Sequence, residues 1–166
     1  QEELAHFDDA EGHRGQLEER QRSTVAVAAQ LAHALSAERR REAQELGRVI
    51  SSELQTLGMG GAEVHVEVAP LSSERGQLAV DGVRLTASGF DHVELLIAPN
   101  PGEEPKPLAR IASGGELSRA LLAIKKTLAG LGPGGLYVFD EVDTGVGGAI
   151  AEVIGRKLDA LAAHRQ

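Results

Sequence analysis

The sequence contains no cysteine and no tryptophan, and only one tyrosine and three phenylalanines occur among its 166 residues. Without cysteine the chain can form neither a disulfide nor a thiolate metal site, which fits a reducing compartment. Because aromatic residues are so few, a core has to be built from Ala, Val, Leu and Ile. Hydrophobic residues make up 42% of the chain, which is enough for such a core and argues against disorder.

Membrane-spanning segments and an excess of basic residues are also missing. No apolar run reaches the roughly 18 residues of a membrane span, and the first residues lack the layout of a signal peptide. We therefore expect a cytoplasmic protein with no membrane partner. The chain has 17 basic and 25 acidic residues and a formal net charge of -8, so its charge gives no argument for binding DNA.

The first third of the chain has the composition of a long helix. Residues 18–57 contain no proline and one glycine, Gly47, in a run rich in strong helix formers. Apolar residues recur mostly three or four positions apart, with a polar interruption at 38–45. About forty residues would span roughly 60 Å, more than a compact domain needs. We interpret residues 1–57 as one arm of a coiled coil whose partner lies outside this sequence; a long surface helix is the alternative.

The rest of the chain alternates between strand and helix patterns. Glycines at 58–61 are expected to end the long helix. Helices are predicted over 115–129 and 148–164, and glycine with proline at 132–135 marks a turn between them. Four prolines within 99–107 should exclude regular hydrogen-bonded structure there. Strands are predicted at 64–68, at 77–80 and 83–86 around the hairpin turn Asp81-Gly82, at 93–98, and, as a buried strand, at 136–139.

The first motif that carries chemistry is Ser113-Gly114-Gly115-Glu116-Leu117, which stands at the start of a predicted helix. Two glycines let a ligand approach the backbone closely, and a helix N-terminus offers unpaired N–H groups and a partial positive charge. The motif therefore fits an anion site, or alternatively a serine N-cap with glycines in the turn. Cations flank the glycine-rich stretches, where a phosphate ligand would need them: Arg110, Arg119, Lys125, Lys126, Arg156 and Lys157.

The second motif is the apolar run 136–139 followed by Asp140-Glu141. A buried strand that ends in two acids presents both carboxylates at the edge where open α/β sheets bind their ligands. Burying unpaired carboxylates is costly, and a metal ion relieves that cost. In nucleoside triphosphatases an acid at this position holds Mg²⁺. The same pattern also arises by chance.

Together these motifs resemble the signature motif, the Walker B strand and, with Asp143, the D-loop of ABC-type ATPases. Val142 stands where transporters usually have proline, and the stretch Asp-Glu-Val-Asp-Thr-Gly-Val-Gly-Gly at 140–148 resembles the chromosome-maintenance and repair branch. Residues 93–102 and 107–119 narrow the resemblance to the SMC-like RecN family of bacterial DNA double-strand-break repair proteins. It covers residues 18–166, with 90–150 the specific part, while residues 76–88 fit the family poorly and look like an insertion.

The resemblance implies an α/β fold in which residues 58–166 form the C-terminal lobe of an ABC- or SMC-type ATPase head. Residues 1–57 would be the returning coiled-coil helix. It also implies that Asp140 holds Mg²⁺ through water and that Glu141 is the general base for ATP hydrolysis. Ser113, Gly114, Gly115 and Glu116 would face the γ-phosphate of ATP bound to a second head, and Asp143 would lie at the same interface.

The implied partners are an N-terminal lobe that carries a P-loop, a second copy of the head in an ATP-dependent homodimer, and DNA. The sequence contains no Gly-Lys dipeptide and therefore no P-loop of its own. We accordingly predict that this chain alone does not hydrolyse ATP. Two alternatives remain: a head fragment of another SMC- or RecF-type ATPase, and a non-enzymatic coiled-coil interaction module in which both motifs are structural.

Overall fold

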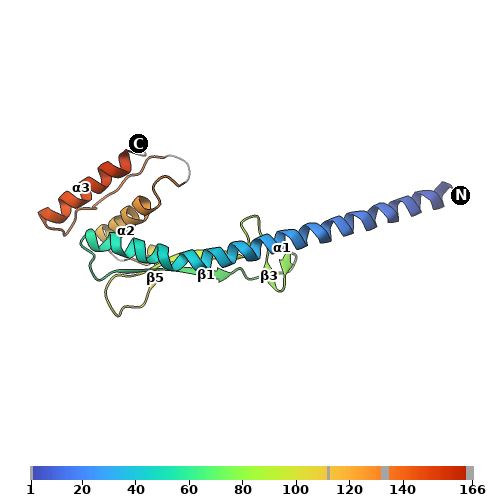
Figure 1. Ribbon diagram of the computed structural model, residues 1–166, viewed down its shortest axis with the longest axis horizontal. Coiled ribbons are helices and arrows are strands. Elements are labelled where there is room, and N and C mark those ends of the chain that lie inside the picture. Colours follow the sequence, from blue (N-terminus) through green and yellow to red (C-terminus); the bar gives the residue numbers. More distant parts are fainter. Residues whose placement is uncertain (1, 112, 132–134, 164–166) are drawn as a thin grey trace. The chain divides into compact units, whose positions relative to one another are not determined.

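The computed structural model describes residues 2–111, 113–131 and 135–163, with side chains from residue 12 onward. Its fold is mixed α/β, with a long N-terminal helix, a small antiparallel sheet and two further helices (Figure 1). The chain divides into two compact units, one made of residues 1–40 and 69–92 and the other of residues 41–68 and 93–166. The elements follow one another as α1 (Glu2–Thr56), β1 (Glu63–Pro70), β2 (Ala79–Val80), β3 (Val83–Arg84), β4 (Asp91–Ala98), β5 (Lys106–Pro107), the 3-10 helix η1 (Leu108–Arg110), α2 (Gly114–Thr127) and α3 (Gly148–Ala162).

Helix α1 confirms the predicted long helix and begins earlier, at Glu2. The helix ends just before the glycines of residues 58–61, as predicted. Gly58 has φ +80° and donates its N–H to Gln55 O, while the N–H of Met59 reaches Leu54 O at 3.1 Å.

A coiled-coil partner for α1, and the division of the chain at residue 57, stay predictions. Among the described residues, no helix is long and apolar enough to cross a lipid bilayer.

The first unit packs the segment 69–92 against the middle of α1. Phe90 is buried against Ala29 and Ala32 of the helix. The next residue, Asp91, has a fully buried carboxylate that accepts hydrogen bonds from Ser36 Oγ at 2.7 Å and from Arg39 at 3.3 Å. These bonds compensate the cost of burying the charge.

The hairpin predicted at Asp81-Gly82 is confirmed, although its strands are shorter than expected. Strands β2 and β3 pair antiparallel, with Ala79 opposite Arg84 and Val80 opposite Val83. Asp81 and Gly82 both have positive φ, 52° and 80°, as a two-residue type I′ turn requires.

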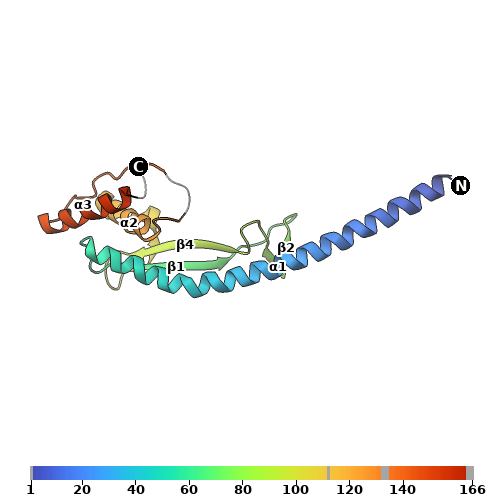
Figure 2. The same cartoon turned by 45° about the horizontal axis from the view of Figure 1, so that its top comes forward.

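The three-stranded sheet has the order β1-β4-β5, with β1 beside β4 (Figure 2). Strands β1 and β4 confirm the predictions at 64–68 and 93–98. The exclusion of hydrogen-bonded structure from the proline-rich stretch was wrong at its end, because Lys106 and Pro107 pair antiparallel with Ile97 and Leu96. Pro107 is tolerated there because β5 is an edge strand, where the missing N–H removes no bond inside the sheet.

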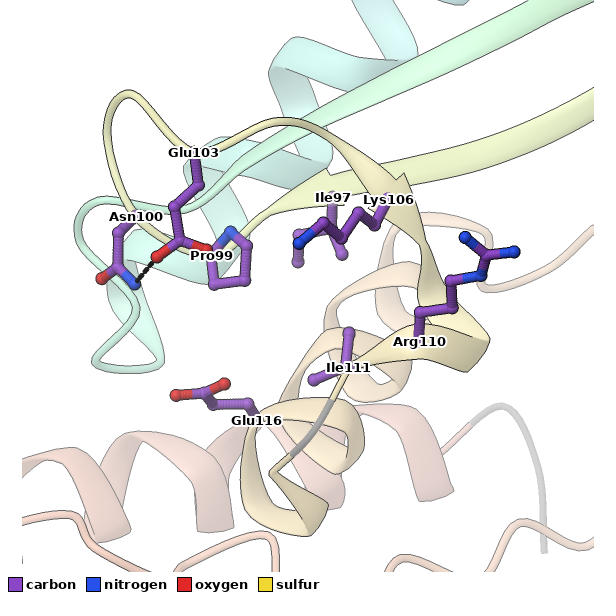
Figure 3. A pocket seen from close by; sticks show the side chains of 8 residues that line it. All are labelled: Ile97, Pro99, Asn100, Glu103, Lys106, Arg110, Ile111 and Glu116. Carbon is purple, nitrogen blue, oxygen red and sulfur yellow. Dashed lines mark hydrogen bonds between the residues drawn. The ribbon is translucent and has the colours of Figure 1, made fainter.

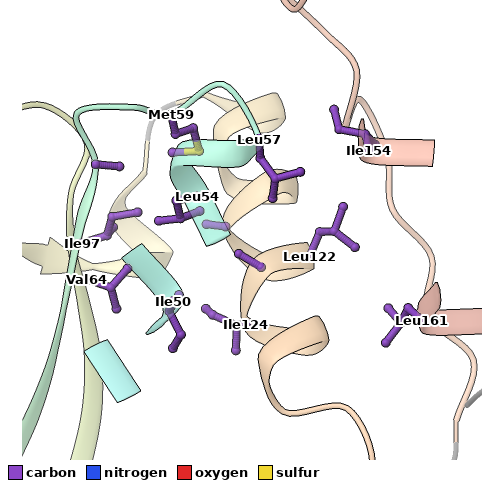
Figure 4. Close-up of a cluster of buried hydrophobic side chains, with 13 residues drawn as sticks. Ile50, Leu54, Leu57, Met59, Val64, Ile97, Leu122, Ile124, Ile154 and Leu161 are labelled. Atoms are coloured by element: carbon purple, nitrogen blue, oxygen red, sulfur yellow. The ribbon is translucent and has the colours of Figure 1, made fainter. Parts of the chain in front are cut away.

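The core of the second unit joins α1, the sheet, α2 and α3 (Figure 4). Its largest fully buried side chains are aliphatic, as the scarcity of aromatic residues required: Ile50, Leu54, Leu57, Ile97 and Leu122. Gly47 explains how α1 can lie so close to β1, since a Cβ at this position would be only 2.7 Å from Val64 O. Ser51 completes the contact by accepting the N–H of Val64 at 2.8 Å.

A shared carboxylate links the last turns of α1 to the two C-terminal helices. Glu53 pairs with Lys126 of α2 at 2.7 Å and with Lys157 of α3, whose side chain is only 10% exposed. Burial raises the pKa of the Glu53 carboxyl, but hydrogen bonds from both lysines and their positive charges outweigh burial and hold that pKa below its ordinary value. These two cations therefore serve packing in this structure, although their positions suggested phosphate binding.

The predicted helices at 115–129 and 148–164 are confirmed as α2 and α3, but the buried strand at 136–139 was wrong. Leu136 and Val138 are 78% and 82% exposed, whereas Tyr137 and Phe139 are half-buried against the core. The segment alternates as a strand does, yet no described strand runs beside it, and a buried strand needs hydrogen-bonded neighbours. Most of the predicted turn, residues 132–134, and the end of the last predicted helix, from residue 164, lie outside the described residues.

Candidate functional site

Ser113 is the N-cap of α2. Its backbone is extended, with φ -97° and ψ 124°, and its hydroxyl accepts the N–H of Glu116 at 3.4 Å. Ser113 and Gly114 are exposed, whereas Gly115 is buried. The capping role that the sequence allowed is therefore present. The long hydrogen bond and the exposed hydroxyl leave this helix start accessible to an anion.

The two predicted acids stand in a tight turn that we call the acid turn, residues 140–145. Glu141 has φ +53°, a left-handed conformation that costs a residue with a side chain roughly 1–2 kcal/mol. Its carbonyl accepts the N–H of Thr144 at 3.0 Å, and Gly145 has φ +73°. Asp140, Glu141 and Asp143 are all exposed. The acids thus lie on a turn, and not at the end of a paired strand as predicted.

The two glycines allow the acid turn to lie directly against the start of α2. A Cβ on Gly114 would stand 2.6 Å from Glu141 Oε2. A Cβ on Gly115 would stand 3.1 Å from Glu141 O and 3.3 Å from Thr144 O. The structure therefore brings together the serine-glycine motif and the acids that the sequence singled out, within one chain. Close packing against backbone oxygens requires a glycine at position 115, whereas Gly114 faces only the flexible end of the Glu141 side chain.

Two residues of α2 that follow the glycine motif also contact the acid turn, a role that the motifs did not predict for either of them. Ser118 Oγ donates to Asp140 O at 2.5 Å. Arg119 donates from Nη1 to Thr144 O at 3.0 Å and to Val142 O at 3.5 Å. A signal was available, because Arg119 lies four residues after Gly115 and three before Leu122 and so falls on the buried face of the helix.

The donor set fits a magnesium ion only in part. Among the described residues, no group of three or more His, Asp or Glu could hold a metal ion. Mg²⁺ usually keeps several waters and is held by one or two carboxylates together with phosphate oxygens. The exposed carboxylate of Asp140 suits that kind of site, while a dedicated protein cage is not formed by the described residues.

A pocket of about 220 Å³ lies on the sheet side of the start of α2 (Figure 3). Its apolar part comes from Ile97, Pro99 and Ile111, and Lys106 reaches into it from β5. Glu116 is its only contribution from the serine-glycine motif. The acid turn does not line the pocket. The remaining lining residues are Asn100, Glu103 and Arg110.

Sequence comparison finds that the chain is similar to bacterial DNA repair proteins. The DNA repair protein RecN of Xylella fastidiosa strain Temecula1 is 41% identical over 154 residues, which are 93% of this chain and 26% of the relative. RecN of Treponema pallidum is 36% identical over 166 residues, all of this chain and 28% of the relative. RecN of Streptomyces coelicolor is 42% identical over 137 residues, 82% of this chain and 24% of the relative. No protein-family model matches.

The chain is therefore a homologue of RecN over most of its own length, which confirms the resemblance found in the motifs. It spans about a quarter of the length of the relatives it matches.

Proposed function

We propose that this chain is part of the ATPase head of a RecN-like DNA repair protein. The observation that carries the proposal is the identity to RecN proteins, 41% over 154 residues in one relative and 36% over the full 166 residues in another. The contact between the start of α2 and the acid turn supports it, because both predicted motifs then belong to one local structure.

In this proposal the start of α2 binds the γ-phosphate of ATP. Ser113 supplies a hydroxyl, Gly114 and Gly115 contribute the backbone N–H groups of the helix N-terminus, and Glu116 completes the motif. The positive end of the helix favours the negative phosphate. The exposure of Ser113 and Gly114 supports a ligand that comes from outside this chain, as expected for ATP bound by a second head.

The acid turn supplies the groups for hydrolysis. Glu141 acts as the general base that orients the attacking water and accepts its proton. Asp140 would hold Mg²⁺ through water, and a bound ion would supply positive charge next to the phosphates. Asp143 lies at the contact between two heads. The exposure of all three carboxylates is compatible with these roles.

The proposed partners are a lobe that carries the P-loop, a second head and DNA. The exposed side chains of Leu136 and Val138 support the first of these, since they form an apolar edge directly before the acids. ATP is part of the contact between the two heads, so the heads dissociate when ATP is hydrolysed. DNA is proposed as a partner because the relatives are DNA repair proteins.

The test uses the full-length protein and the substitution Glu141→Gln, with Glu152→Gln on the exposed face of α3 as a matched control. Without a proton acceptor, ATP hydrolysis should fall at least a hundredfold, in line with the range for general bases. ATP binding should stay within about threefold, and ATP-dependent dimers should accumulate in size-exclusion chromatography. Hydrolysis by Glu141→Gln within tenfold of the parent would rule out Glu141 as the base, and steady-state turnover by the isolated chain would rule out the need for a P-loop lobe.

A further inference from the structure

We propose that Arg119, assisted by Ser118, is a positioning residue that holds the acid turn on α2. The proposal rests on the proposed function, because the acids of this turn are the groups assigned to hydrolysis. These two adjacent side chains of α2 fix the path of the backbone that carries Asp140, Glu141 and Asp143.

The donors reach every second carbonyl of the turn. Ser118 Oγ bonds Asp140 O at 2.5 Å, and Arg119 Nη1 bonds Val142 O at 3.5 Å and Thr144 O at 3.0 Å. A turn has few hydrogen bonds of its own, and here the described ones include Thr144 N–H to Glu141 O at 3.0 Å. The bonds from α2 therefore supply much of the restraint on the direction of the acidic side chains.

Arg119 is an unusual side chain for a purely structural role. It is only 7% exposed, and within the described part of the chain its hydrogen bonds go to carbonyl oxygens and not to a carboxylate. Its buried Nε has no hydrogen-bond partner among the described residues. A buried cation without a counter-ion costs folding free energy, so an apolar residue at this position would pack at lower cost. The hydrogen bonds of Arg119 to the acid turn give a reason for a cation at this buried position.

The restraint also acts on a strained residue. Glu141 has φ +53° and its carboxylate lies over Gly114, so the turn keeps this side chain in a conformation that a free loop would seldom adopt. If the turn is released, Glu141 can relax and its carboxylate moves. A displacement of about 1 Å at a catalytic group can reduce a rate a hundredfold.

The first experiment measures the restraint itself by hydrogen–deuterium exchange in the full-length protein. Arg119→Met keeps the length of the side chain and removes the donors, and Ser118→Ala is a milder second variant in case Arg119→Met folds poorly. The control is Arg156→Met, which breaks an exposed pair with Glu152 on α3. Amides in 142–146 should exchange at least tenfold faster in Arg119→Met, less so in Ser118→Ala, and at the parental rate in the control. Unchanged exchange in both α2 variants would overturn the proposal.

The second experiment separates positioning from folding by the kinetics of ATP hydrolysis. In Arg119→Met, kcat should fall tenfold or more while KM stays within threefold, measured well below the unfolding temperature of the variant. Faster exchange with an unchanged kcat would leave Arg119 a structural residue and overturn its positioning role. If the parental protein does not hydrolyse ATP, the proposed function is wrong, and the exchange rates still decide whether Arg119 holds the turn.

Discussion

Replacing Gly47 by alanine has two effects of opposite sign on the free energy of unfolding. Inside a helix, alanine is favoured over glycine by up to about 1 kcal/mol. The new Cβ, however, would stand 2.7 Å from Val64 O, closer than real Cβ contacts allow. Because that oxygen belongs to the backbone of β1, the clash cannot be relieved by rotating a side chain. Either the strand or the helix has to shift.

The magnitude follows from these contacts. Overpacking of this kind costs about 1–3 kcal/mol. A shift of β1 away from α1 also weakens the 2.8 Å bond from Val64 N–H to Ser51 Oγ, which is worth about 1 kcal/mol. These losses exceed the gain in helix propensity, so we expect Gly47→Ala to lower the free energy of unfolding by about 1–3 kcal/mol.

The assay is urea unfolding of the chain followed by tyrosine fluorescence. Tyr137 is the only tyrosine and the sequence has no tryptophan, so the signal reports on the second unit. The control is Gly155→Ala in α3, where a new Cβ meets nothing within 4 Å. That variant should be up to about 1 kcal/mol more stable than the parent. If Gly47→Ala proves as stable as the parent or more so, the close approach of α1 and β1 is wrong.

The remaining predictions concern Glu53 and Gly114. The pKa of Glu53 in the folded chain is below its ordinary value of 4.5. The ion pairs of Glu53 therefore stabilise the fold fully at pH values above the unfolded-state pKa, and this stabilisation is lost as the pH falls through the lower folded-state pKa. Urea midpoints of the parent and Glu53→Gln should therefore differ most near pH 7 and converge below about pH 4.5; a difference independent of pH would contradict the ion pairs. In Gly114→Ala the new Cβ meets only the flexible end of Glu141, so unfolding should change by less than about 0.5 kcal/mol while ATP hydrolysis by the full-length protein falls at least tenfold. An unchanged rate would show that the Glu141 position seen here does not matter for hydrolysis.

Features set by neighbours in the sequence could be predicted from it. The glycine cap after α1, the positive φ angles of Asp81-Gly82 and the serine cap of α2 each depend on a few consecutive residues, and all three are present. The serine-glycine motif and the acids also indicate the RecN family, in agreement with the identity to RecN proteins. Propensity, capping and motif spacing are local properties, so the sequence carries them directly.

Only the tertiary structure decided which groups meet across long separations. Glu53 pairs with Lys157, which lies 104 residues later, and Arg119 reaches the carbonyl of Thr144. Their positions beside glycine-rich stretches suggested that these cations serve a phosphate, but their partners are a carboxylate and the backbone. The run 136–139 has the pattern of a buried strand, yet it leaves Leu136 and Val138 exposed. A strand is buried only when other segments pair with it and cover it, and a charge finds its partner only when folding brings the two together, so neither outcome is written in the local sequence.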